Sequence, residues 1–287
     1  MPSAQSRALL AALLLGANRV QETSWLVEAV WGDRPPAASA DHLAAHIAKL
    51  RRLLGRRITL VGPQHIGSAS ANGAAGSGAA PSGTTASTRH SAQPAVGSRA
   101  DAEADAGSAI SPNGKGSTGG YLLRVEPMQL DLALFEETAK RARIDLAARD
   151  YASAAAGFRA GLALWRGAPL SDVDSKLLRE FEAPRLEELR LSAVEDRIEA
   201  DLRLGQHAQV VDELRSLTAA HPLRERFCRH LIIALYRCRH RDAALQAYAT
   251  AERAMRALGV SPGPSLRQLA LAVRTDHPSL GPPDPRR

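Results

Sequence analysis

The chain has 287 residues, of which 45% are hydrophobic, 4% aromatic and 23% charged. This length is typical of about two domains, and the shortage of large rings favours a helical fold over a β-sandwich or barrel. Two cysteines exclude a disulfide scaffold and indicate a reducing compartment. The net charge of +7 indicates nucleic acid or another polyanion as a partner.

The segment 7–17 has features of a short signal peptide, because Arg7 precedes an apolar run. No A-x-A cleavage site follows it, and an amphipathic segment over 25–31 continues the chain. The run is also too short for a membrane span, which needs about 20 apolar residues. We therefore expect a soluble, cytoplasmic protein without a membrane segment.

Three helices are predicted near the N-terminus, over about 6–15, 23–30 and 39–54. Gly16 and Gly55 end the first and third of these, as glycine commonly does after a helix. The second and third segments carry apolar stripes at helical spacing. The N-terminal unit is therefore predicted to be mainly helical.

Two β-prone runs, 57–61 and 120–125, flank a segment of different composition. Residues 67–119 are rich in Gly, Ala, Ser, Pro and Thr and nearly free of large apolar side chains, so we expect them to be disordered. The two runs are predicted to form one antiparallel hairpin with this insert at its tip. Such an insert is tolerable because the cost of loop closure grows only logarithmically with length.

The C-terminal half is predicted to be almost entirely helical. A small residue recurs after three turn-like stretches, at Ala152, Ala208 and Ala243, and the last two lie 35 residues apart. A tetratricopeptide helix pair repeats every 34 residues or so, which predicts a tetratricopeptide-like domain. The longer first interval leaves room for one long helix over about 176–204, whose carboxylates we expect to form i, i+4 ion pairs on a solvated face.

The third helix is the most informative element. Its apolar residues Leu43, Ile47, Leu50 and Leu54 fall at i, i+4, i+7 and i+11, which is one face of a helix. The opposite face carries cations, histidines and a small residue: His42, Ala45, His46, Lys49, Arg52 and Arg56, with Arg51 flanking them. Such a helix fits the major groove of B-DNA, although an ordinary solvated face is the alternative. The position before a hairpin favours a winged helix-turn-helix.

Several motifs keep a common order along the chain. In the N-terminal unit they are 7–16 (RALLAALLLG), 29–36 (AVWGDRPP), 46–55 (HIAKLRRLLG) and 120–125 (GYLLRV). In the C-terminal unit they are 164–170 (LWRGAPL), 185–191 (RLEELRL), 195–202 (EDRIEADL), 221–226 (HPLRER) and 259–264 (GVSPGP). With these motifs the chain resembles the streptomycete antibiotic regulatory protein (SARP) family of transcriptional activators.

The resemblance implies a mainly α fold with two domains. A winged helix-turn-helix would cover 1–66 and 120–126, and a tetratricopeptide-like bacterial transcriptional activation domain would cover 127–278, followed by a disordered tail over 279–287. The implied function is sequence-specific DNA binding and activation of transcription of a secondary-metabolite gene cluster, without a cofactor. The six polar-face residues of the third helix and the flanking Arg51 would contact DNA.

The resemblance also implies partners. Two copies would bind direct repeats in double-stranded DNA as a homodimer. The loop after the second helix would contact RNA polymerase through Trp31, Gly32, Asp33, Arg34 and Pro35.

Two features depart from the family pattern. Members usually begin with a small N-terminal sheet, but here the first helix starts almost at once, so we expect Leu9, Leu10, Leu13 and Leu14 to be partly uncovered. The insert lies in the wing, where it could displace a DNA contact. The alternative function is a helical-repeat module that binds a protein or a small ligand, with a winged domain that no longer binds DNA.

A metal site and an enzyme are both disfavoured. The pairs Cys228/His230 and Cys238/His240 have ligand chemistry, but on one continuous helix they would lie about 15 Å apart, too far to share an ion. The sequence also lacks a nucleophile–base set and a glycine-rich nucleotide motif. We therefore expect neither a metal nor catalysis.

Overall fold

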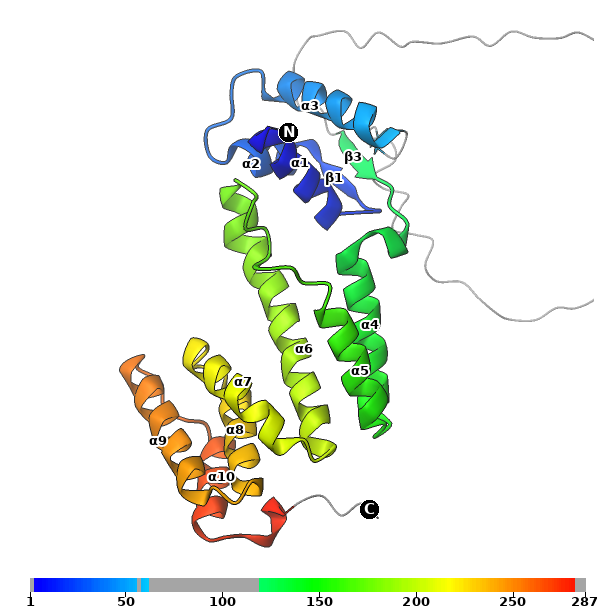
Figure 1. Ribbon diagram of the computed structural model, residues 1–287. Coiled ribbons are helices and arrows are strands. Elements are labelled where there is room, and N and C mark those ends of the chain that lie inside the picture. The colour runs from blue at the N-terminus through cyan, green and yellow to red at the C-terminus, as the bar shows by residue number, and fades with distance from the viewer. Residues whose placement is uncertain (1–2, 56–57, 62–118, 282–287) are drawn as a thin grey trace, which may run out of the picture.

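The computed structural model describes residues 3–55, 58–61 and 119–281, which form a winged domain joined to a longer helical domain (Figure 1). The winged domain contains α1 (Ala4–Leu15), α2 (Thr23–Trp31) and α3 (Ser39–Leu54), with β1 (Val20–Glu22), β2 (Ile58–Val61) and β3 (Gly120–Leu123). The helical domain contains α4 (Asp131–Ala147), α5 (Tyr151–Leu162), α6 (Ala183–Arg203), α7 (His207–Ala220), α8 (Glu225–Arg237), α9 (Arg241–Ala257) and α10 (Pro264–Arg274). The predicted mainly α fold is confirmed.

The three strands form one antiparallel sheet in the order β1-β3-β2, so β3 is the central strand. β2 pairs with β3, with Leu60 opposite Tyr121, which confirms the predicted hairpin. The sequence did not predict β1, which pairs with the other edge of β3 and places Val20 opposite Leu122. The insert predicted for the hairpin tip lies outside the described residues, apart from Gly119.

The core of the winged domain contradicts the expected exposure of α1 at Leu9 and Leu13, but not at Leu10 and Leu14. Leu9 and Leu13 are fully buried, and Leu10 and Leu14 are half-buried against the same apolar cluster. α2, α3 and β3 contribute to this cluster, and so do residues 170–178 of the helical domain. For Leu9 and Leu13 the expectation is wrong because the second domain adds to this cluster packing that the local sequence pattern does not reveal.

Residues 173–178 join the two domains through apolar and polar contacts. Val173 and Leu178 are buried in the winged core. The buried Ser175 hydroxyl donates to the Ala29 carbonyl (2.6 Å) and accepts from the backbone N–H of Leu178 (3.3 Å). Ala29 carries one of the last four carbonyls of α2, which a helix cannot satisfy by itself. The helical domain therefore supplies a hydrogen-bond donor to the C-terminal end of α2.

The helix pairs of the helical domain share one turn motif. At Arg149, Gly205 and Arg239 the backbone is left-handed. In each turn the N–H of the next residue bonds to the carbonyl five residues before it, which is the Schellman arrangement. This shared turn accounts for the repeat that is visible in the sequence.

The repeat is one residue shorter than the sequence alignment predicts. α7 and α9 begin at His207 and Arg241, which are 34 residues apart, the tetratricopeptide period. The structural counterpart of Ala208 is therefore Asp242. The alignment of Ala208 with Ala243 is wrong by one residue, because the small residue is the second residue of α7 but the third residue of α9.

The long helix predicted over 176–204 is present but is not regular throughout. Its beginning contains the π-helix η4 (Leu178–Glu182), and α6 follows directly. Pro184 explains the wide turns, because proline donates no backbone hydrogen bond and its ring crowds the carbonyl four residues earlier. α6 then extends from the winged domain to the C-terminal helices, and α4, α5, α7 and α8 pack against it (Figure 1).

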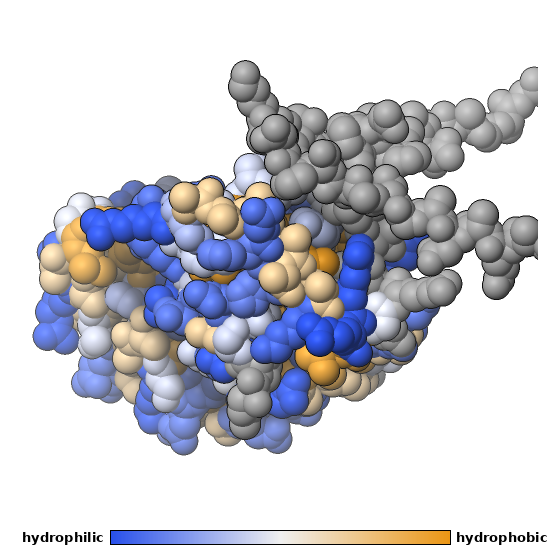
Figure 2. Space-filling view, turned by 90° about the horizontal axis from the view of Figure 1, so that it is seen from above, coloured by the Kyte–Doolittle hydropathy of each residue, from blue (hydrophilic) through white to orange (hydrophobic). Residues whose placement is uncertain are grey.

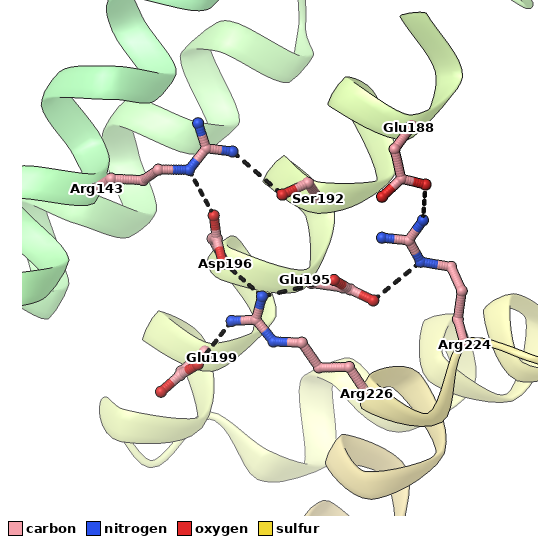
Figure 3. Close-up of polar contacts among 8 residues, drawn as sticks. All are labelled: Arg143, Glu188, Ser192, Glu195, Asp196, Glu199, Arg224 and Arg226. Atoms are coloured by element: carbon pink, nitrogen blue, oxygen red, sulfur yellow. Dashed lines mark hydrogen bonds and ion pairs between the residues drawn. The ribbon is translucent and has the colours of Figure 1, made fainter. Parts of the chain in front are cut away.

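The carboxylates of α6 lie only partly on a solvated face, in contrast to the prediction. Glu195 and Asp196 are buried, and arginines from other helices reach them (Figure 3). Arg226 of α8 contacts both carboxylates, at 3.5 and 2.8 Å, and Arg143 of α4 bonds Asp196 at 2.9 Å. A buried ion-pair network therefore links α6 to its neighbours, in addition to apolar packing.

The end of the described chain also differs from the prediction. The 3-10 turn η5 (Pro278–Leu280) continues the fold past residue 278. Leu280 packs against the C-terminal core, and its carbonyl accepts a hydrogen bond from Arg237 (3.4 Å). The tail expected from residue 279 thus begins with packed residues, and 282–287 lie outside the described residues.

Candidate nucleic-acid interface

α3 has two faces, which follow from the period of its sequence. Leu43, Ile47 and Leu50 are at most 2% exposed and pack into the winged core. Asp41 lies in the first turn and Arg52 in the last, which is the charge order that the helix dipole favours. The apolar face therefore anchors the helix and leaves the opposite face to solvent.

The DNA contacts predicted from the sequence fall mainly on this exposed face. The exposed members are His42, Ala45, Lys49, Arg51 and Arg52. Within the described part of the chain, no carboxylate pairs with Lys49 or Arg52. Arg56 lies outside the described residues. Figure 2 views the molecule from this end and shows hydrophilic residues mixed with apolar ones.

His46 differs from the other predicted contacts because it is half-buried. Its Nδ1 atom lies 3.0 Å from the Ser6 hydroxyl of α1, and its ring centroid lies 6.1 Å from that of Trp31. Burial, with smaller effects of Lys49 and His42, lowers the pKa of His46 below its usual value. His46 therefore fixes α3 against α1 and α2, and its imidazole is less available to a base edge than the exposed side chains are.

The loop predicted to contact RNA polymerase begins in contact with α3. Trp31 is half-buried, and its ring centroid lies 6.5 Å from that of His42. Asp33, Arg34 and Pro35 are exposed. Gly32 has a φ of 62°, a left-handed conformation that glycine adopts without strain, and it turns the chain out of α2. The loop therefore presents exposed side chains directly beside the cationic helix.

The helical domain holds this loop through one ion pair. Lys176 Nζ lies 3.1 Å from Asp33 Oδ2, and both side chains are more than half exposed. The hydrogen bond to Asp33 raises the pKa of Lys176. The pair is exposed, so it contributes little to stability, but it connects the loop to the segment that also carries Ser175.

Sequence reasoning missed Ser6, Ser175 and Lys176. Lys176 is 143 residues from Asp33 in the sequence, and Ser6 is 40 residues from His46. Neither pair has a local spacing signal, since both depend on how the domains and helices pack. The exposed residues of α3 could be found because their signal is the period of a single helix.

The cysteine and histidine pairs of the C-terminal half do not form a ligand set. Cys228 and His230 are buried in α8, whereas Cys238 and His240 lie in the turn after this helix, so the helix predicted to hold all four ends at Arg237. Burial raises the pKa of Cys228 to about 12 and lowers that of His230 to about 4. In the described ranges, no three His, Cys, Asp or Glu side chains converge as a metal site would require. No described helix combines the length and the apolar character that a membrane crossing demands.

Residues 130–274 match the family model of the bacterial transcriptional activator domain. Over 96% of its length the chain is 31% identical to the regulatory protein DnrI of Streptomyces peucetius, of which it covers 85%. Over 98% of its length it is 32% identical to the regulatory protein AfsR of Streptomyces griseus, but it spans only 23% of AfsR. These matches support the resemblance that the sequence motifs indicate.

A solved structure of Mycobacterium tuberculosis EmbR, in complex with a low-affinity phosphopeptide, is similar in fold, with a TM-score of 0.72 at 26% identity. The match covers 96% of this chain and 60% of the EmbR chain. The family consists of transcriptional regulators and not of enzymes, as the sequence predicts. The chain belongs to the SARP family of transcriptional activators, and its helical domain is a bacterial transcriptional activator domain.

Proposed function

We propose that the chain is a sequence-specific DNA-binding activator of transcription in the cytoplasm, and that it controls a gene cluster for a secondary metabolite. The observation that carries this proposal is the cationic face of α3, which is exposed while its leucines are buried. In this proposal α3 enters the major groove, where Lys49 and Arg52 bond phosphates or guanine edges and the small Ala45 permits close approach.

The same proposal assigns a role to each segment. Residues 1–66 with 120–126 bind DNA, and residues 127–278 form the activation domain. His42, Arg51 and Arg56 extend the DNA-contacting face, while His46 supports it from behind. The insert 67–119 lies in the wing.

The loop after α2 is proposed to contact RNA polymerase. Asp33, Arg34 and Pro35 are exposed, and the ion pair from Lys176 holds the loop beside the activation domain. A homodimer on direct repeats one helical turn apart places two such loops on the same side of the DNA. Arg34→Ala is expected to reduce transcription in a reconstituted assay without changing DNA affinity.

The test of DNA binding is fluorescence anisotropy with DNA from upstream of the neighbouring genes, at about 50 and 200 mM salt. Wild type is expected to bind one fragment, more weakly at the higher salt because each counterion released from the phosphates then gains less entropy. Lys49→Ala and Arg52→Ala are each expected to lower the affinity about tenfold. Arg253→Ala, which removes an exposed cation of α9, is the matched control and leaves the affinity unchanged.

Two outcomes separate the hypotheses. Wild-type affinity in both α3 variants would remove α3 as the DNA reader. Failure of wild type to bind any fragment would favour the alternative function, a helical-repeat module for a protein or small ligand.

A further inference from the structure

A cavity of about 450 Å³ lies between the two domains. α1 contributes Leu14 and Leu15 to its wall, α4 contributes Phe135, and α6 contributes Leu186. The loop after α5 closes it through residues 164–172. Ligand pockets commonly have volumes of about 300–1,000 Å³, mostly apolar walls and positions between domains. This cavity has all three properties, and neither α3 nor the loop after α2 lines it.

The closing loop contains the LWRGAPL motif, which the proposed function does not use. Trp165 packs edge-on against Phe135, with ring centroids 5.1 Å apart. Its indole N–H is shielded from water and has no hydrogen-bond partner within the described residues, although a buried indole N–H usually has one. Leu170 has a left-handed backbone with a φ of 56°, which a leucine rarely adopts. Trp165 with its unpaired N–H and Leu170 with its strained backbone both line the cavity, and such features cluster at binding sites.

The rim of the cavity limits the charge of a ligand. Arg166 is the one cation among the described lining residues, and its guanidinium lies 3.6 Å from the Asp131 carboxylate. Asp172 adds a second carboxylate to the lining. The rim therefore has no surplus of positive charge for an anionic ligand, and the mostly apolar wall favours an uncharged molecule over a cation.

The volume limits the size of a ligand. A dry cavity of about 150 Å³ can hold one benzene molecule, so the cavity here holds two or three fused rings. The aliphatic and aromatic side chains of the wall match such a ring system. The indole N–H is a donor without an acceptor, which a ligand oxygen can supply.

We propose that this cavity binds an uncharged, mostly aromatic molecule of two or three fused rings that carries a carbonyl oxygen. The rings lie between α1, Phe135 and Leu186, and a small turn of the indole brings the Trp165 N–H to the carbonyl. Because both domains line the site, the bound molecule stabilises their docked arrangement. The proposal does not depend on the DNA-reading role of α3.

The test uses prodan, an uncharged naphthyl ketone whose emission shifts to the blue in apolar surroundings, with the full chain. Saturable binding of one prodan per chain is expected, together with a rise in melting temperature. Ala11→Phe fills the cavity from α1 and is expected to weaken binding at least about tenfold. Ala249→Phe, at an exposed position of α9, is the matched control and leaves binding unchanged.

A second comparison tests the hydrogen bond. Trp165→Phe removes the N–H and keeps an aromatic ring, so prodan is expected to bind about tenfold more weakly. Dimethylaminonaphthalene, which lacks the ketone, is expected to bind both proteins equally. Equal binding of prodan to wild type and Trp165→Phe would overturn the assigned role of the indole.

The cavity itself has a separate test. If circular dichroism shows that Ala11→Phe is unfolded, Ala168→Trp at the exposed rim replaces it. Absence of saturable binding to wild type would overturn the proposal. So would equal prodan affinity in the cavity-filling variant and in Ala249→Phe.

Discussion

On α3 the side chains of Lys49 and Arg52 are exposed, whereas in the helical domain the side chain of Arg197 is only 11% exposed and contacts Asp201 and Glu213 at 2.8 and 2.5 Å. The same contrast holds for Arg224, which bonds Glu195 at 3.0 Å (Figure 3). The cations of α3 therefore face solvent, whereas Arg197 and Arg224 connect segments of the helical domain.

The difference teaches that the number of cations does not locate a binding surface. Residues 121–287 carry 26 of the 37 Lys and Arg, but 23 Asp and Glu offset them. Residues 1–66 carry only eight Lys and Arg, against four Asp and Glu. What distinguishes α3 is that its cations are exposed on one face. Variants in both domains test this contrast, and the largest effect is expected in the helical domain.

Removing a buried carboxylate from the helical domain has the largest expected effect. Asp201 is 1% exposed, and Arg159 and Arg197 bond it at 2.5 and 2.8 Å. Asp201→Ala leaves both guanidinium groups without this partner, so the free energy of unfolding is expected to fall by about 3–5 kcal/mol in urea titrations. Asp212→Ala removes an exposed partner of Arg215 and is expected to change it by less than about 0.5 kcal/mol. Equal losses would contradict the distinction between buried and exposed pairs.

Acid is expected to weaken the helical domain through His230. Burial, with a smaller effect of Arg226, lowers the pKa of His230 to about 4. The unfolded chain therefore binds more protons than the folded chain between about pH 4 and 6.5, and the free energy of unfolding falls as the pH drops through this window. Between pH 7 and 4.5 the loss from this group is roughly 2–3 kcal/mol.

The control for this pH effect is His230→Gln, which cannot titrate. Urea unfolding of the variant and of wild type at pH 7 and 4.5 separates the histidine from the carboxylates that titrate in both proteins. An identical pH dependence in the two proteins would show that His230 is not the responsible group.

Arg52→Ala tests whether an exposed cation of the winged domain contributes to DNA binding and not to stability. Its unfolding free energy is expected to stay within about 0.5 kcal/mol of wild type, because the side chain is exposed and unpaired with carboxylates in the described structure. Its DNA affinity is expected to fall about tenfold. A loss of stability comparable to that of Asp201→Ala would mean that this arginine also holds the fold together.

The smallest expected effect is a gain of stability in a turn. Arg239 has a φ of 66°, which costs a residue with a Cβ atom about 1–2 kcal/mol. Arg239→Gly relieves this strain but makes the unfolded chain more flexible, so a net gain of about 0.5–1 kcal/mol is expected. Thermal unfolding measures it. Arg253→Gly, inside α9, is expected to lower the free energy of unfolding by about 1 kcal/mol. A loss of stability in both variants would contradict the strain assigned to the left-handed backbone at Arg239.

The parts of the fold that the sequence predicted depend on local periods. The buried residues of α3 recur at helical spacing, and the β2–β3 hairpin consists of two recognisable β-prone runs. The exposed candidates Lys49 and Arg52 follow from the same period. These features need no knowledge of distant contacts.

The parts that it did not predict depend on packing between distant segments. β1 has three residues, too few for a clear pattern, and its partner β3 is far along the chain. Glu195 and Asp196 have the composition of a solvated face, and only the arginines of other helices explain their burial. The cavity between the domains has no sequence signal beyond the unexplained LWRGAPL motif.

The docking of Val173 and Leu178 into the winged core has a consequence for biosynthesis. A ribosome releases α1, α2 and α3 well before it releases these two residues, which belong to the same apolar cluster. Contacts between segments so far apart form late, and the unfinished core stays open to chaperones and proteases meanwhile. A nascent chain that stops before this segment therefore carries α3 on an incomplete support, and prematurely terminated products are expected to be degraded.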